Sequence, residues 1–196
     1  MNLEQLNPYL PDNALIFIEQ WIKNHPLTLK ITRNRLTKLG DYRKINVPKR
    51  HQITINGDLN TYAFFFVFTH EIAHMITYSH YSHHEILPHG KEWKLIFGKL
   101  LVESLSVYPK ELQGYILHHA KSPKASVGAD SNISKYLIND SKEHEDYLED
   151  LEIGSFFKLG QKIYCKNEKR KLRYICTEIK THKKYLINAT AIVEKL

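Results

Sequence analysis

The chain has 196 residues, of which 42% are hydrophobic and 25% charged, an ordinary composition for a folded globular protein of one domain with a small appendage. The longest clean apolar run, residues 63–68, is far too short to cross a bilayer, and the N-terminus lacks the basic and apolar regions of a signal peptide. Only two cysteines are present, which excludes a disulfide framework. We therefore expect a cytoplasmic protein with no membrane partner.

The formal net charge is +7 and the pI is about 9.2. This balance favours an acidic partner, with nucleic acid first among the candidates. A basic protein without such a partner remains the alternative.

The N-terminal region is predicted to form a helix followed by a small sheet. Asp12 can cap the helix. Residues 27–33 and 51–56 alternate between apolar and polar side chains, which predicts strands, and Gly40-Asp41 indicates a turn between short strands. We expect a three-stranded antiparallel sheet before the next helix.

Basic residues dominate this region, with Asp41 as the single acid among them. They form either a solvated face or a phosphate-contacting surface, on which Tyr42 could stack on a nucleobase. The basic residues are Lys30, Arg33, Arg35, Lys38, Arg43, Lys44, Lys49 and Arg50. Of these, Arg33, Arg35, Arg43 and Lys44 are the candidates for nucleic-acid contacts.

The next helix, predicted from Asn60 or Thr61 to about Tyr78, carries the pattern HExxH from His70 to His74. Each helical residue turns roughly 100°, so both imidazoles can reach one metal ion. Glu71 projects beside them and can deprotonate a water bound to the metal. This is the arrangement of a zinc metalloprotease whose glutamate is the general base.

A catalytic zinc site needs a third protein ligand, and three solutions compete. His80 has the metzincin spacing, but Thr77 occupies the position of the metzincin glycine and no Met-turn is present. Glu92 or Glu103 would give a His-His-Glu site. His89 is the strongest candidate, because it begins a second amphipathic helix, predicted over residues 90–104, that can return its N-terminus to the metal.

The sequence HEIAH followed by PHGKEWK resembles the SprT family of zinc metallopeptidases, the bacterial relatives of Spartan. The resemblance extends upstream to residues 38–43 and 53–56, and more weakly to the C-terminus. It implies that His70, His74 and His89 bind one Zn²⁺ and that Glu71 is the catalytic base. Because Spartan degrades proteins crosslinked to DNA, it also implies a protein substrate on DNA.

Residues 1–120 are therefore expected to form a SprT-like zincin metallopeptidase domain, ending with a helix over residues 109–119. Residues 121–152 lack periodicity and end in an acidic stretch, so they predict a linker. From residue 153 short β-prone runs predict a small basic antiparallel meander over residues 153–196. Its candidate nucleic-acid contacts are Lys169, Arg170, Lys171 and Arg173.

Many SprT-like proteins end in a zinc ribbon with two cysteine pairs, and this chain departs from that pattern. Cys165 and Cys176 occupy the first position of each pair, and the second cysteines are absent. Because a structural zinc needs four ligands, we expect this module to bind no metal, even if His182 is counted.

The sequence thus predicts an α+β fold, in which a zincin-like domain precedes a small β module. The expected function is a zinc-dependent endopeptidase that acts on DNA-bound or DNA-crosslinked proteins, with single-stranded DNA as one partner. The alternative is a nucleic-acid-binding regulator whose zinc site is structural or weakly active.

Overall fold

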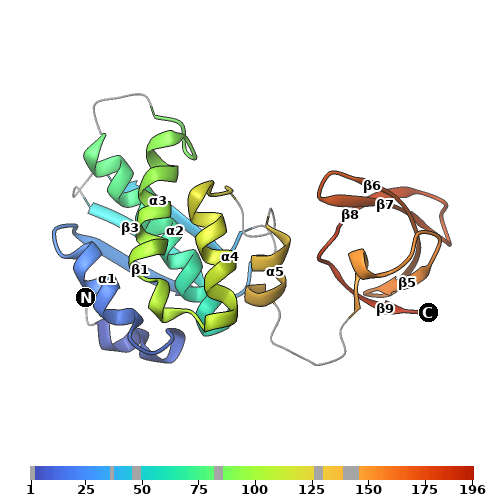
Figure 1. The fold of residues 1–196 in the computed structure, drawn as a ribbon, viewed down its shortest axis with the longest axis horizontal. Coiled ribbons are helices and arrows are strands. Elements are labelled where there is room, and N and C mark those ends of the chain that lie inside the picture. Colours follow the sequence, from blue (N-terminus) through green and yellow to red (C-terminus); the bar gives the residue numbers. More distant parts are fainter. Residues whose placement is uncertain (1–2, 36–37, 46–49, 82–85, 126–129, 139–145) are drawn as a thin grey trace. The chain divides into compact units, whose positions relative to one another are not determined.

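A computed structural model describes residues 3–35, 38–45, 50–81, 86–125, 130–138 and 146–196. The chain divides into two compact units, residues 1–127 and residues 128–196 (Figure 1). Both units contain helices and strands, so the α+β class predicted from the sequence is confirmed. Among the residues that the structure describes, no helix has the length and apolar character needed to cross a membrane.

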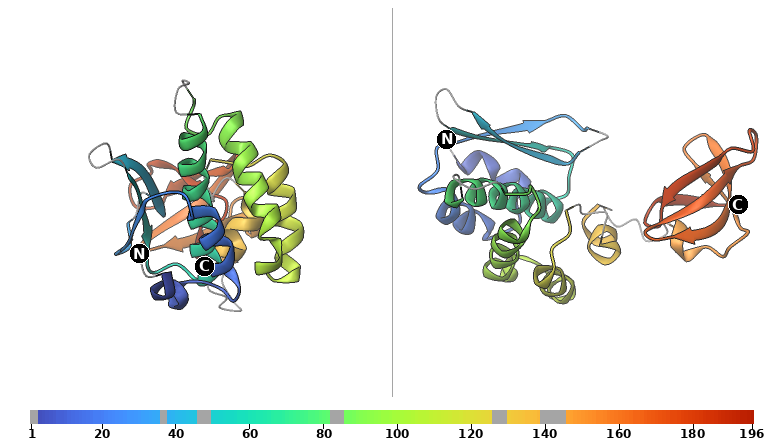
Figure 2. Two further views of the ribbon diagram at one scale, coloured as in Figure 1. Left: turned by 90° about the vertical axis from the view of Figure 1, so that its left-hand side faces the viewer. Right: turned by 90° about the horizontal axis from the view of Figure 1, so that it is seen from above.

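The first unit places one long helix between a sheet and two further helices, as the right panel of Figure 2 shows. Its helical elements are η1 (Leu3–Tyr9), α1 (Ala14–Ile22), α2 (Thr61–His80), α3 (Lys91–Glu103), η2 (Leu105–Val107) and α4 (Lys110–Lys121). Its strands are β1 (Leu27–Thr32), β2 (Gly40–Ile45) and β3 (Arg50–Asn56). The long helix α2 packs against β2 and β3 on one side and against α3 on the other.

The sheet has the order β1-β3-β2, with β3 in the centre. β2 pairs with β3 in antiparallel fashion, as expected, but β1 runs parallel to β3, with Leu27 opposite His51. The prediction of a fully antiparallel sheet was therefore wrong. The chain reverses before β2 and again before β3, so β1 and β3 point the same way. Gly40 and Asp41 also begin β2 instead of forming a turn.

The helix α2 is buried on most of its surface. Its N-cap is Asn60, as expected, whose side chain accepts a hydrogen bond from the Ala63 backbone N–H at 2.8 Å. Phe64, Phe65 and Phe68 are fully buried, which anchors this helix in the core by removing large aromatic surfaces from water. A helix held this firmly is a rigid base for the polar side chains that it carries.

The helices α3 and α4 approach closely at Gly98. A Cβ atom there would lie 2.4 Å from the backbone oxygen of Ala120, so only glycine permits this contact. The tight packing holds α3 in place, and the N-cap of α3 is Gly90, directly after His89.

The second unit begins earlier than the sequence indicated. Its elements are α5 (Ser131–Ile138), β4 (Asp146–Tyr147), η4 (Leu148–Asp150), β5 (Phe156–Leu159), β6 (Lys162–Arg170), β7 (Arg173–Glu178), β8 (Lys184–Asn188) and β9 (Ile192–Lys195). The predicted linker, residues 121–152, thus contains α5, β4 and η4, and Leu148 and Leu151 belong to the core of this unit. These two leucines lie among acidic residues, so the acidic composition of the stretch gave no sign that part of it is buried.

The six strands of the second unit have the order β4-β9-β5-β6-β7-β8. Strands β5 to β8 form the expected antiparallel meander, and β9 returns to pair with β5. Two charged residues are buried in the described part of this unit, Glu178 at 4% exposed and Lys166 at only 2% exposed. Lys166 is the basic one. Its ammonium donates to the backbone oxygens of Glu149 (3.2 Å) and Leu151 and lies 3.9 Å from the centre of the Tyr174 ring. These contacts offset the cost of burying the charge.

Candidate metal centre

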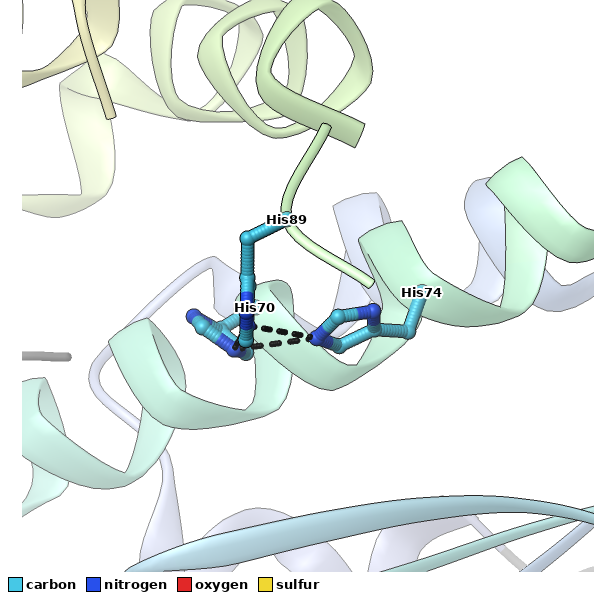
Figure 3. Close-up of side chains that lie close together, drawn as sticks. All are labelled: His70, His74 and His89. Carbon is cyan, nitrogen blue, oxygen red and sulfur yellow. Dashed lines mark hydrogen bonds between the residues drawn. The ribbon is translucent and has the colours of Figure 1, made fainter. Parts of the chain in front are cut away.

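Three histidines from two elements converge in the first unit (Figure 3). His70 and His74 lie one turn apart on α2, and His89 lies just before α3. The Nε2 atoms are 3.2 Å apart between His70 and His74, 3.1 Å between His74 and His89, and 3.3 Å between His89 and His70. The structure thus brings the three predicted ligands together in a nearly equilateral triangle of nitrogens.

These three contacts cannot all be hydrogen bonds between neutral imidazoles. Each Nε2 either carries a hydrogen and donates or lacks one and accepts. Among three mutual neighbours at least two are of the same kind, so at least one contact joins two donors or two acceptors. A cation that takes one lone pair from each nitrogen removes this conflict. The geometry also fits, because zinc–nitrogen bonds of about 2.0–2.1 Å in a tetrahedron hold their nitrogens about 3.3 Å apart.

The surroundings keep the histidines neutral, which is the form that binds metals. Burial, followed by the neighbouring histidines, lowers the pKa of His70 to about 2. Burial and His89 lower the pKa of His74 to about 4. The pKa of His89 is also lowered, first by burial and then by Lys94. Protons therefore compete weakly with a metal ion for this site at neutral pH.

The ring of Trp93, in α3, contacts all three imidazoles. Its centroid lies 4.7 Å from that of His70, 5.2 Å from that of His74 and 4.6 Å from that of His89. Trp93 itself is 1% exposed and covers one side of the triangle with a buried aromatic ring. An apolar wall of this kind restricts the rotamers of the ligands and strengthens electrostatic interactions at the centre.

Glu71 leaves α2 roughly 100° around the axis from His70, and its carboxylate faces β2. The carboxylate accepts a hydrogen bond from the Tyr42 backbone N–H. A Cβ atom on Gly40 would lie 2.6 Å from Glu71 Oε1, so β2 can approach this closely only with glycine there. Burial, with a further contribution from Asp41, raises the pKa of Glu71 to about 8. Its proton affinity is thus that of a base that works near neutral pH.

Sequence reasoning missed the role of Gly40 and Tyr42 at this site. The pair Gly40-Asp41 is typical of a turn, although a glycine inside a strand also signals the close approach of another group. The Tyr42 ring lies nearly parallel to that of His74, at 7° with centroids 6.3 Å apart, a contact that the sequence did not predict.

The other candidate third ligands lie apart from the triangle. The Glu103 carboxylate accepts from Trp21 Nε1 at 3.0 Å, and Glu92 lies 3.8 Å from the Lys91 ammonium. His80 is the last residue of α2. Among the described residues, His70, His74 and His89 are the only group of three or more that can hold a metal ion.

The predicted basic residues of the first unit do not form one uniform surface. The Arg35 guanidinium bonds inward, to Asn56 Oδ1 at 2.8 Å and to Thr54 Oγ1 at 2.9 Å. Arg43 forms an ion pair with Asp41 at 2.6 Å. Lys44 donates to Tyr78 OH at 2.7 Å, and Arg33 is exposed. Arg35 thus holds the end of the sheet together, and Arg33, Arg43 and Lys44 remain at the surface.

The basic residues predicted in the second unit gather where β6 turns into β7. Lys169, Arg170, Lys171 and Arg173 are all exposed there. Lys171 has a positive φ of 57°, as a tight turn between two strands requires. The turn therefore presents four cations along a short stretch of chain.

The two cysteines cannot share a metal ion. Cys165 pairs across the sheet with Thr177, and Cys176 pairs with Lys166. Because partners in register point to the same face and successive residues alternate, the two thiols lie on opposite faces of the sheet. Cys176 is fully buried and Cys165 partly exposed. The sheet therefore separates the two thiols.

Comparisons with protein-family models, with curated protein sequences and with solved structures find no match to this chain. The functional assignment therefore depends on the geometry of the site and on the motif that forms it.

Proposed function

We propose that the protein is a zinc-dependent endopeptidase of the SprT type. The observation that carries this proposal is the convergence of three imidazole Nε2 atoms, 3.1 to 3.3 Å apart, from the HExxH helix and the residue before α3. Three protein ligands leave one coordination position open, which distinguishes catalytic zinc sites from structural ones.

His70, His74 and His89 would hold the ion. Three neutral nitrogen ligands in a tetrahedral spacing suit zinc better than magnesium or calcium, which prefer oxygen. When bound, the ion supplies a Lewis acid that makes water more acidic and polarises a peptide carbonyl.

Glu71 would transfer the proton. Its carboxylate accepts the proton of the attacking water and then passes it to the nitrogen of the leaving amine. The raised pKa of Glu71, about 8 without a metal, supports this role, because the group can take up and release a proton near neutral pH. The Tyr42 N–H fixes one side of the carboxylate and thereby limits the directions in which it can turn.

The proposed substrate is protein held on DNA, including single-stranded DNA. The resemblance to the SprT family supports this substrate. The net charge of +7 and the four exposed cations at the β6–β7 turn provide attraction to phosphates. Electrostatic attraction of this kind would raise the concentration of DNA-bound proteins around the enzyme.

The test compares purified wild-type protein with Glu71→Gln on a DNA-binding protein, with and without single-stranded DNA, together with the zinc content of both. We expect about one zinc per chain in both proteins, cleavage by the wild type alone, and faster cleavage with DNA. Zinc in both proteins and cleavage by neither, under every DNA condition, would contradict the hydrolytic function.

The second candidate is a nucleic-acid-binding regulator whose zinc site is structural or weakly active. The cluster of Lys169, Arg170, Lys171 and Arg173 at the β6–β7 turn favours it. In that case the wild type would bind single-stranded DNA without cleaving the protein on it. Replacing these four residues by glutamine would weaken DNA binding and reduce its dependence on salt.

A further inference from the structure

Tyr42 contacts the metal centre twice, once through its backbone and once through its side chain. Its N–H donates to the Glu71 carboxylate, and its ring lies nearly parallel to the His74 ring, 6.3 Å away between centroids. Because the N–H and the ring belong to one residue of a strand, they move together. A displacement of Tyr42 would therefore disturb the predicted base and one predicted ligand at the same time.

The far end of the Tyr42 side chain is also fixed. Its hydroxyl forms a hydrogen bond of 2.9 Å with Nδ1 of His51, on the central strand β3, and the two rings stack with centroids 5.8 Å apart. The rings of His25 and His51 form a T-shaped pair, with centroids 5.7 Å apart. The contacts then return to α2, because His25 Nδ1 lies 3.3 Å from Ser79 Oγ.

The contacts thus form a loop that begins at His74 and Glu71 on α2, crosses β2 and β3, and returns to α2 at Ser79. A single offset ring contact is weak and tolerates sliding. The hydrogen bond from Tyr42 to His51 removes that freedom, since it fixes the ring to the centre of the sheet.

We propose that Tyr42, anchored by His51, is a positioning residue that sets the orientation of both the metal ligand His74 and the base Glu71. Its catalytic consequence depends on the proposed peptidase function, whereas its effect on the metal site does not. Residues that orient metal ligands from outside the coordination sphere commonly change metal affinity about 10- to 100-fold when they are mutated.

The structure offers a control in a second tyrosine hydroxyl that forms a hydrogen bond with β2. Tyr78 of α2 also uses its hydroxyl in a contact with β2, accepting from Lys44 at 2.7 Å. Tyr78→Phe therefore removes one hydrogen bond between α2 and β2, and Tyr42→Phe removes one between β2 and β3 while it keeps the ring. A general loss of packing would affect both variants alike.

The experiment uses the full chain with Tyr42→Phe, His51→Phe, the double variant and Tyr78→Phe. Zinc affinity is measured by competition with a chelator, and the visible spectrum of the Co²⁺-substituted protein reports ligand geometry. We expect Tyr42→Phe and His51→Phe to weaken zinc binding about 10-fold and to alter the cobalt bands. The double variant should be no worse than either single variant, since both break the same bond. Tyr78→Phe should match the wild type.

Wild-type affinity and spectrum in Tyr42→Phe, or equal changes in Tyr42→Phe and Tyr78→Phe, would overturn the proposal. In a peptidase assay, Tyr42→Phe should lower kcat and leave KM nearly unchanged, because Glu71 loses alignment while substrate contacts remain. If the wild type binds zinc but cleaves no substrate, the peptidase function fails and the metal data still decide the role of Tyr42.

Discussion

Each unit contains residue types that can bind metals, and among the described residues only the first unit brings such side chains together. In the first unit His70, His74 and His89 converge within 3.3 Å of one another. In the second unit Cys165 and Cys176 lie on neighbouring strands and on opposite faces of the sheet. The difference arises from the periods of the two kinds of element. Residues i and i+4 share a face of a helix, whereas register parity decides which residues share a face of a sheet.

This comparison shows what makes a metal motif physically meaningful. The spacing of His70 and His74 is sufficient to bring their imidazoles together with that of His89, because α2 is rigid, buried and closely packed against α3. No such arrangement brings the cysteines together, because Cys165 lies opposite Thr177 and Cys176 lies opposite Lys166. Four predictions test or refine this contrast, from the largest expected effect to the smallest.

Removing a histidine should abolish the metal site, and removing a cysteine should leave it intact. His89→Ala leaves two ligands, so we expect the zinc affinity to fall by more than about 100-fold. Cys165→Ser should retain the wild-type zinc content and affinity. Metal analysis after dialysis against a weak chelator measures both. A loss of zinc in Cys165→Ser would mean that the second unit also binds metal.

Removing zinc should destabilise the first unit alone. Ligand linkage predicts about 4 kcal/mol of stabilisation when free zinc is 1,000 times its Kd. Both tryptophans, Trp21 and Trp93, lie in the first unit, and both cysteines lie in the second. Tryptophan fluorescence during denaturation should therefore shift with EDTA, whereas exposure of the Cys176 thiol should not. A shift of both signals together would show that the units unfold as one.

Gly40→Ala should damage catalysis more than metal binding. The new methyl group would meet Glu71 Oε1 at 2.6 Å and Val67 Cγ1 at 2.7 Å, so the carboxylate must move. We expect kcat to fall about 10-fold or more, because small displacements of a catalytic group are costly. Zinc affinity should remain within a few-fold of wild type. The matched control is Gly114→Ala in α4, where, among the described residues, no atom beyond the adjacent turns of the same helix lies within 4 Å of the added carbon.

The metal-free wild type should become less stable than metal-free Glu71→Gln as the pH rises through the titration of Glu71. Its pKa is about 8 in the folded chain and 4.5 at its ordinary value, so the folded state holds the proton over this interval. The contribution of Glu71 to stability therefore falls from pH 4.5 to pH 8 and changes little above that. Glu71→Gln lacks this loss, and the histidine contributions cancel between the two proteins. Its advantage in unfolding free energy should grow to at least about 1 kcal/mol by pH 8.

Local sequence patterns predicted much of the first unit. The apolar run around His70 and the cap at Asn60 indicated α2 closely, and the position of His89 at the start of a helix indicated the third histidine of the group. The direction of β1 could not be predicted, since alternation defines a strand but not its neighbour or its sense. The contacts of Gly40 and Tyr42 with α2 also join distant segments that no spacing rule relates.

The second unit shows the converse limit. The acidic composition of residues 142–152 suggested a linker, and it concealed Leu148 and Leu151, which are needed to close the core. Composition averages over residues, whereas burial depends on individual side chains. The sequence shows too few cysteines for a structural zinc site. That Cys165 and Cys176 lie on opposite faces of the sheet follows from the strand register, which the sequence does not reveal.

The buried ammonium of Lys166 can be used to detect opening of the second unit. An amine that is 2% exposed and bonded to the backbone of η4 and its neighbour is shielded from acylating reagents, while the surface lysines react at once. Acylation of Lys166 then proceeds only as fast as the unit opens, and once acylated the side chain loses its charge and cannot return to the same contacts. Following the acylation of this one lysine by mass spectrometry would report how often the second unit opens in the full chain, with no substitution in the sequence.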